Sequence, residues 1–253
     1  MLQNSICVKI PSKLICMDFK LFPASDRKLK DLGWLKSNFT FSFSNFQDPT
    51  RISFGSLVVF NDDFVQPEKG FGIHAHQNME IISVMLNGSM SHKDDMGYNN
   101  VVKEGSVQIM SAGSGLYHEE YNVGQDDVNF LQIWISPKLQ NTKPRYQFRH
   151  FPKHTRKNKL QLIVSNEEGM DHCWINQNAK LSLGYFDETT TINYTLNPTN
   201  KCIFIFCIEG GLDIEKKRLS KRDAIGIWNT SEFTLKCEKD SEFIIIETPI
   251  NQK

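Results

Sequence analysis

Four residues whose side chains bind metal ions occur as two closely spaced pairs. His74 and His76 form the first pair, and His118 and Glu120 form the second, with one residue between the members of each pair. On a β-strand, residues two positions apart point to the same face, about 7 Å apart along the strand. If two such strands face each other across a barrel, three imidazoles and one carboxylate converge. The spacing therefore predicts a site for one metal ion.

The donor set indicates which ions such a site would bind. Three neutral imidazoles and a carboxylate suit Fe(II), Mn(II), Ni(II), Cu(II) or Zn(II). Four protein ligands leave one or two positions open for a substrate or for O₂. A closed structural zinc site would use more cysteine, and no cysteine lies near these pairs in the sequence. An open, chemically active centre is the prediction.

Other titratable residues lie close to the two pairs. Glu80 could be a fifth ligand, a carboxylate that hydrogen-bonds to a ligand imidazole and orients it, or a surface carboxylate, and strand alternation from His76 favours the orienting role. Glu119 should face away from Glu120 and be solvated. His92 follows a predicted hairpin and is expected to be structural or exposed.

The segments that carry these residues read as short strands separated by turns. Apolar runs at intervals of eight to twelve residues are typical of an all-β sandwich or barrel, and they occupy residues 57–60, 79–86, 107–110 and 129–135. No amphipathic helix longer than three turns is expected. The fold class predicted from the pattern is therefore all-β.

An aromatic stretch precedes the metal-binding pairs. Residues 38–46 alternate aromatic and polar side chains with period two, which predicts a half-buried strand. Phe39, Phe41 and Phe43 would share its inner face. Together with Tyr121 they could wall an apolar pocket for a flat ligand, or they could be ordinary barrel core.

The second half of the chain repeats the strand pattern of the first. Three apolar segments recur in the same order, with residues 204–210, 221–228 and 243–249 matching residues 81–88, 103–110 and 130–137. This repetition predicts two copies of one fold. The polar, basic stretch at residues 144–159 is interpreted as the linker, which gives domains at 1–143 and 144–253.

The metal-binding residues are not repeated in the second copy. Counting back from the turn that matches Gly88, Leu196 and Pro198 stand where histidines would be needed. We therefore expect the 144–253 domain to be structural.

Composition narrows the class of protein further. The chain has 253 residues with 29 acidic and 29 basic side chains, so it has no charge excess for binding nucleic acid. No apolar run is long enough to span a membrane or to form a signal peptide. The six cysteines are scattered, which favours reduced thiols. We expect a cytoplasmic monomer.

The two ligand pairs lie in longer motifs that resemble those of the pirin family of cupin proteins. The first motif is His74-Ala75-His76 followed by Glu80, and the second runs from Met110 through Gly113 and Gly115 to His118 and Glu120. The resemblance covers residues 25–250 and is closest to the pirin-like quercetinases of bacteria. Ala75 departs from it, because proline is usual there.

The resemblance implies a bicupin fold, with two tandem double-stranded β-helix (jelly-roll) barrels. It also implies one divalent metal ion, usually iron, held by His74, His76, His118 and Glu120, and a quercetin 2,3-dioxygenase activity that uses a flavonol and O₂. In that activity Glu120 would accept the proton of the flavonol hydroxyl. Two alternatives stay open: a metal- or redox-sensing pirin that acts without catalysis through a protein partner, and a different cupin reaction such as isomerisation or hydrolysis.

Overall fold

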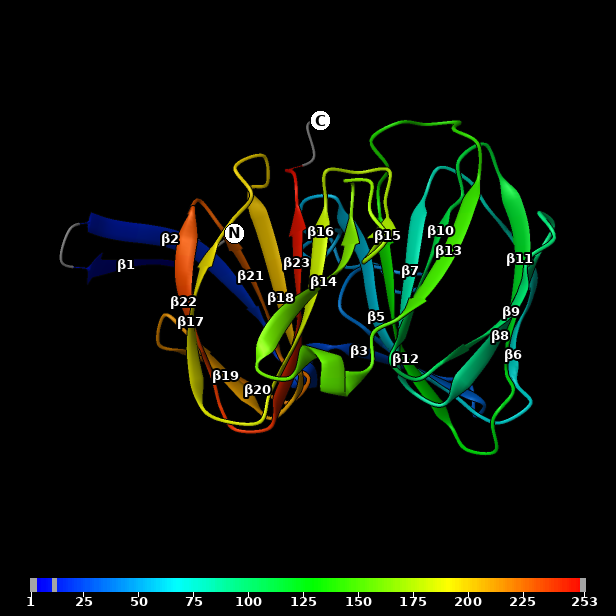
Figure 1. The fold of residues 1–253 in the computed structure, drawn as a ribbon, viewed down its shortest axis with the longest axis horizontal. Coiled ribbons are helices and arrows are strands. Elements are labelled where there is room, and N and C mark those ends of the chain that lie inside the picture. Colours follow the sequence, from blue (N-terminus) through cyan, green and yellow to red (C-terminus); the bar gives the residue numbers. More distant parts are fainter. Residues whose placement is uncertain (1–3, 11–12, 251–253) are drawn as a thin grey trace. The chain divides into compact units, whose positions relative to one another are not determined.

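The structure is a computed structural model that describes residues 4–10 and 13–250. Within these ranges the chain forms β-strands and two short 3₁₀ helices, η1 (Ala24–Asp26) and η2 (Lys153–Arg156), and no α-helix (Figure 1). The all-β prediction is thus confirmed. No helix in the described ranges is long and apolar enough to cross a membrane.

The chain divides into two compact units. Unit 1 comprises the described parts of Met1–Arg27, Lys153–Ser165 and Asn178–Lys253, and unit 2 comprises Lys28–Pro152 and Asn166–Gln177. This division differs from the single boundary expected between residues 143 and 144. The chain starts in unit 1, and the expected boundary falls inside unit 2.

Unit 2 consists of two antiparallel sheets that face each other (Figure 1). The larger sheet has seven strands in the order β13 (Arg145–His150), β10 (Ser106–Ser111), β7 (Glu80–Asn87), β12 (Val128–Ile135), β5 (Leu57–Val65), β4 (Leu35–Phe39) and β3 (Lys28–Asp31). The smaller sheet has four, in the order β6 (Gly70–His76), β11 (Leu116–Asn122), β8 (Ser89–Asp94) and β9 (Asn99–Lys103). The short β15 (Cys173–Trp174) also belongs to this unit.

Apolar side chains from both sheets of unit 2 pack between them. One cluster joins Met85 and Phe130 of the larger sheet to Met90 and Val102 of the smaller one. A second cluster includes Leu116 of β11 and residues of the larger sheet. Burial of these side chains holds the two sheets together.

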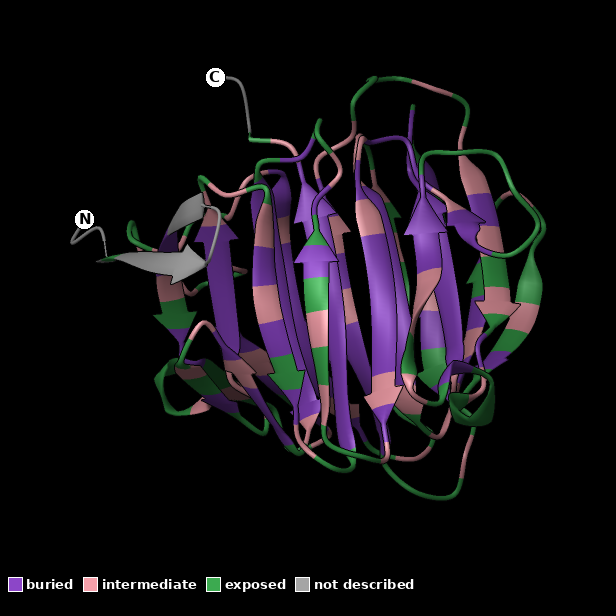
Figure 2. Cartoon of the chain, turned by 60° about the vertical axis from the view of Figure 1, so that its left-hand side comes forward, coloured by how far each residue is buried: buried purple, intermediate pink, exposed green. Residues whose placement is uncertain are grey.

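Unit 1 has the same two-sheet organisation. Its larger sheet runs in the order β1 (Asn4–Ile10), β2 (Lys13–Phe22), β21 (Ala224–Trp228), β18 (Cys202–Glu209), β23 (Ser241–Thr248), β16 (Lys180–Phe186) and β14 (Lys159–Ser165). Its smaller sheet runs β17 (Thr190–Thr195), β22 (Glu232–Cys237), β19 (Gly211–Ile214) and β20 (Lys217–Ser220). A large apolar cluster fills the space between these sheets, and Figure 2 shows central strands buried along most of their length.

In unit 1, one of the two residues that stand where histidines would be needed lies in the apolar interior. Leu196 is buried in the apolar cluster, together with Met17 and Phe19 of β2. Cys202, Cys207 and Cys237 are buried free thiols of this unit, as predicted, and Cys173 is a fourth in unit 2. Cys7 and Cys16 have side chains outside the described part.

The strand expected over residues 38–46 is wrong beyond its first two residues. The strand β4 ends at Phe39, and the chain then folds back, with Phe43 bridged to Phe46 and Ser44 at a φ of 54°. Ser42 stabilises this turn by accepting a hydrogen bond from the backbone N–H of Asp48. The period-two pattern instead extends upstream, where Leu35, Ser37 and Phe39 share a face.

Candidate metal centre and its cavity

The two predicted ligand pairs lie on neighbouring strands of the smaller sheet. His118 of β11 pairs directly with His74 of β6, and Leu116 pairs with His76. The expected arrangement, with the two strands facing each other across a barrel, is therefore wrong. The side chains converge because they stand side by side on the inner face of one sheet.

A β-bulge adjusts the position of Glu120. The register between β6 and β11 shifts between His118 and Glu120, so that Glu120 pairs with Phe71. Gly70 permits the close approach of the strands here, because a Cβ atom at this position would lie 2.0 Å from the carbonyl oxygen of Glu120. Bulges of this kind redirect a side chain next to a functional site.

Three imidazoles meet at the inner face of the smaller sheet. The ring centroid of His74 lies 4.3 Å from that of His118 and 4.8 Å from that of His76, and the His76 and His118 centroids are 5.1 Å apart. One ligand atom from each of the three lies within 4.8 Å of the others. In a second group, formed by His92, His118 and Glu120, one ligand atom from each residue also lies within 4.8 Å of the others.

The chemistry of these side chains fits a divalent metal ion. His118 is only 2% exposed, yet neither of its ring nitrogens has a hydrogen-bond partner. Burial lowers the pKa of both His76 and His118 to about 4, so their imidazoles are neutral at pH 7, as metal ligands must be. His74 directs Nδ1 to the carbonyl oxygen of Gly72 at 2.8 Å, which leaves its Nε2 for an ion.

Glu120 is a buried carboxylate. Burial alone would raise its pKa, but the nearby His92 and the hydrogen bond from Gln108 outweigh that effect, and the pKa lies below its usual value. Gln108 donates a hydrogen bond to the same carboxylate. An acceptor that stays ionised inside the barrel can bind a metal ion or take up a proton from a ligand.

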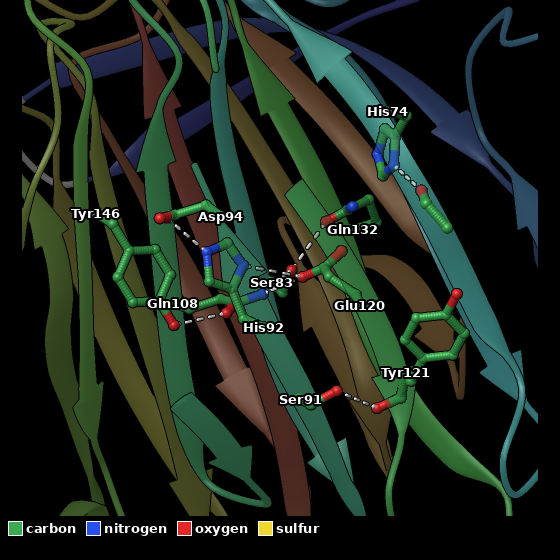
Figure 3. Close-up of polar contacts among 11 residues, drawn as sticks. His74, Ser83, Ser91, His92, Asp94, Gln108, Glu120, Tyr121, Gln132 and Tyr146 are labelled. Atoms are coloured by element: carbon green, nitrogen blue, oxygen red, sulfur yellow. Dashed lines mark hydrogen bonds and ion pairs between the residues drawn. The ribbon is translucent and has the colours of Figure 1, made fainter. Parts of the chain in front are cut away.

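His92 is a part of the site that the sequence did not assign. It is 1% exposed, with Nε2 2.9 Å from Oδ2 of Asp94 and Nδ1 3.9 Å from Oε1 of Glu120 (Figure 3). Its ring stacks on Tyr146 at 4.1 Å. Of the two roles expected for His92, an exposed one is excluded. Only the strand register, which pairs His92 with Glu120, indicates that His92 belongs to the site.

Glu80 does not lie where strand alternation from His76 would put it. His76 ends β6 and Glu80 begins β7 in the other sheet, with Asn78 between them at a φ of 51°. The Glu80 carboxylate accepts hydrogen bonds from the hydroxyl of Ser111 at 2.6 Å and the backbone N–H of Asn176 at 3.2 Å. Its described partners therefore do not include an imidazole.

The buried Glu80 should make stability depend on pH. Burial raises its pKa from 4.5 to about 7 in the folded state. Between these pH values the folded protein keeps a proton that the unfolded chain has released, so the free energy of unfolding falls as pH rises. Glu80→Gln removes this titration, so we expect the variant to be more stable than the parent above pH 7, by on the order of 2 kcal/mol.

Urea denaturation of both proteins from pH 4.5 to 8 measures the difference. The glutamine carbonyl can still accept the hydrogen bond from Ser111, so the fold should be retained. If the two proteins lose stability with pH at the same rate, Glu80 does not titrate as described.

A cavity of about 250 Å³ adjoins the candidate metal centre. Its lining includes both ring-bearing and polar side chains, among them Phe39, Phe43, Phe71, Trp134, Ser37, Asn61, Asp63, Gln132, His74, His76 and Glu120. The rings stand edge to face, with Phe43 5.3 Å from Trp134 and Trp134 5.0 Å from His76. The site thus joins an apolar slot to a polar wall, as in pockets that orient small molecules.

Two of the four predicted pocket residues line this cavity and two do not. Phe39 and Phe43 belong to the lining, whereas Phe41 is a buried core residue 1% exposed, beyond the end of β4. Tyr121 is 37% exposed, because alternation along β11 turns it away from the face of Glu120. Placing Phe41 and Tyr121 in the pocket was therefore wrong.

Comparisons with known proteins agree with this architecture. The pirin family model matches residues 23–135, and a model of the quercetinase C-terminal cupin domain matches residues 162–248. The chain is 32% identical to a putative quercetin 2,3-dioxygenase of Zymomonas mobilis over 89% of this chain and 96% of that protein. It is also 32% identical to the quercetin 2,3-dioxygenase of Escherichia coli K12, with the same coverage.

A solved structure shares the whole fold. The bacterial pirin YhhW from Escherichia coli, crystallised in complex with nickel(II), superposes with a TM-score of 0.87 at 31% identity. The match covers 92% of this chain and 100% of that one.

Proposed function

The chain belongs to the pirin family of bicupin proteins, and on that basis we propose that it is a metal-dependent dioxygenase that opens the central ring of flavonols such as quercetin. The observation that carries the proposal is that the imidazoles of His74, His76 and His118 gather beside an aromatic-lined cavity, while Glu120, which lines that cavity, is grouped with His118 and His92. The names of the relatives support the same chemistry.

We assign His74, His76, His118 and Glu120 as the residues that would hold the metal ion. Fe(II) is the ion we propose, and the nickel(II) complex of the related pirin makes Ni(II) the second candidate. A bound metal would polarise the hydroxyl and carbonyl oxygens of a flavonol and give O₂ an open position.

The residues of the chain contribute binding and proton transfer. Phe39, Phe43 and Trp134 offer ring faces and edges against which a flat substrate can pack while water is excluded. Glu120, held as a carboxylate, accepts the proton of the flavonol 3-hydroxyl. The electron-rich flavonol anion then reacts with O₂, whose two atoms enter the ring-opened product, and carbon monoxide leaves.

The direct test follows quercetin absorbance and O₂ uptake together. The protein would be stripped of metal and reloaded separately with Fe(II), Mn(II), Ni(II), Cu(II) or Zn(II). We expect equal molar loss of quercetin and O₂ with a redox-active ion and none with Zn(II). Tight metal binding without turnover for every ion would reject the dioxygenase and favour a metal-sensing role through a protein partner.

A further inference from the structure

A row of polar side chains crosses the larger sheet of unit 2 in register. Gln108 of β10 pairs with Ser83 of β7, which pairs with Gln132 of β12. Most neighbours of these three residues along the strands are apolar and buried. A row of hydrogen-bonding groups in such strands is costly unless the groups satisfy one another or a ligand.

The row forms a continuous chain of hydrogen bonds that starts at Tyr146. The Tyr146 hydroxyl donates to Oε1 of Gln108 at 3.1 Å, and Nε2 of Gln108 donates to Oγ of Ser83 at 3.2 Å. The Ser83 hydroxyl then donates to Oε1 of Gln132 at 3.0 Å. Figure 3 shows the Gln132 carbonyl oxygen turned toward Ser83.

The direction of the hydrogen bonds in this chain is fixed by Glu120, whose ionised carboxylate can only accept. Nε2 of Gln108 donates to it, so the NH₂ group of Gln108 faces Glu120 and Ser83 and its amide oxygen accepts from the Tyr146 hydroxyl. Ser83 accepts from this NH₂ group and so has its own proton left to donate. Gln132 must therefore turn its oxygen to Ser83 and its NH₂ group away from it.

The NH₂ group of Gln132 has no acceptor among the described residues. Gln132 is half-buried and lines the cavity. The next residue of the row, Asn61, pairs with Gln132 across the strands, but its Oδ1 atom also lacks a partner. The cavity wall thus offers an oriented N–H donor that nothing in the described chain uses.

The same chain orients Glu120. Nε2 of Gln108 donates to Oε1 of Glu120, and Nδ1 of His92 lies 3.9 Å from the same oxygen. Oε2 receives no hydrogen bond from the described residues. Glu120 and Gln132 both line the cavity, so one chain of hydrogen bonds holds both side chains in place on its wall.

We propose that Gln132 is a specificity-determining residue that donates a hydrogen bond to a carbonyl oxygen of the substrate. The ligand matched by this donor is a flat compound that carries a carbonyl group. This inference rests on the proposed function and adds to it the residue that recognises the carbonyl.

Binding to protein loaded with Zn(II) tests the inference without turnover. The probes are 3-hydroxyflavone, which has the hydroxyl and the carbonyl, and a flavan-3-ol, which lacks the carbonyl. Gln132→Met keeps the side-chain volume and removes the donor. We expect it to weaken 3-hydroxyflavone binding about tenfold, the effect of one lost hydrogen bond, and to change flavan-3-ol binding less than about twofold.

Ser83→Ala provides a second variant that leaves Gln132 in place. It removes the group that orients the Gln132 amide, so we expect a loss of about threefold or more, again confined to the ligand with the carbonyl. Ser91→Ala is the matched control, because the Ser91 hydroxyl donates to the backbone oxygen of Tyr121 and takes no part in the hydrogen bonds between Tyr146 and Gln132. Circular dichroism and thermal melting check that each variant is folded.

The outcomes separate this inference from the ring-cleaving function. Equal losses for both ligands, no loss for either, or no binding to the parent protein would overturn the inference. O₂ uptake is measured separately with Fe(II). Losses of binding confined to the ligand with the carbonyl, without O₂ uptake, would support the role of Gln132 and reject the dioxygenase function. O₂ uptake with unaltered binding in Gln132→Met would support the dioxygenase function and reject the role of Gln132.

Discussion

Replacing His118 with alanine should remove most of the metal that the protein binds. His118 lies between the other two imidazoles and Glu120, and both of its ring nitrogens are unpartnered. Loss of one of four ligands from a divalent site should lower affinity by about 100-fold or more. Metal content after dialysis, measured by mass spectrometry, and the dissociation constant from chelator competition give the result.

The matched control is His154→Ala, because His154 is exposed and belongs to unit 1. The His118 variant should remain folded, since its apolar clusters are intact, although the small cavity left by the ring lowers its melting temperature. Full metal occupancy in His118→Ala, with the parent's affinity, would show that the four-ligand assignment is wrong.

Glu120→Gln should abolish most turnover while the protein keeps its metal. The glutamine has the same shape and can still accept a hydrogen bond from Gln108 through its carbonyl oxygen, but it cannot take up a proton. A general base contributes about 10²–10⁴-fold to a rate, and we expect kcat for quercetin to fall within that range. Three imidazoles remain to hold the ion, so metal content should fall less than in His118→Ala.

Glu119→Gln is the control for this change. Glu119 is the adjacent residue on β11, and its partner among the described side chains is Lys93, 3.6 Å away in an ion pair at the surface. Its loss should therefore alter kcat by less than about twofold. A Glu120→Gln protein that turns over quercetin at the parent's rate would remove Glu120 from the catalytic role.

The sequence predicted that His74, His76 and His118 lie together, but not how the strands bring them together. The i, i+2 spacing was enough to put His74 and His76 on one face of their strand, and His118 and Glu120 on one face of theirs. Whether the two strands are neighbours or opposite walls depends on pairings distant in sequence. Local patterns do not encode these pairings, so the facing arrangement was a wrong prediction.

Extrapolated periodicity caused the other errors. The period-two pattern, extended past Phe39, placed Phe41 in the pocket, and extended past His76 it placed Glu80 beside an imidazole. Both predictions failed because the strand ends in a turn at that point. The polar row could not be predicted for a different reason. Ser83 and Gln132 are single polar residues within apolar strands, and only the strand register brings them side by side.

The order of synthesis has a consequence in the pairing of β2 with β21. Asp18 lies opposite Trp228 and Phe22 opposite Ala224. One edge of β2 can pair with β1 at once, whereas the other edge waits about 200 residues for β21. Nearly all of unit 2 is translated during that wait and can close around its candidate metal centre first. A nascent chain stalled near residue 220, so that unit 2 has left the ribosome but β21 has not formed, should therefore protect Leu116–Asn122 from protease while Lys13–Phe22 is still cleaved.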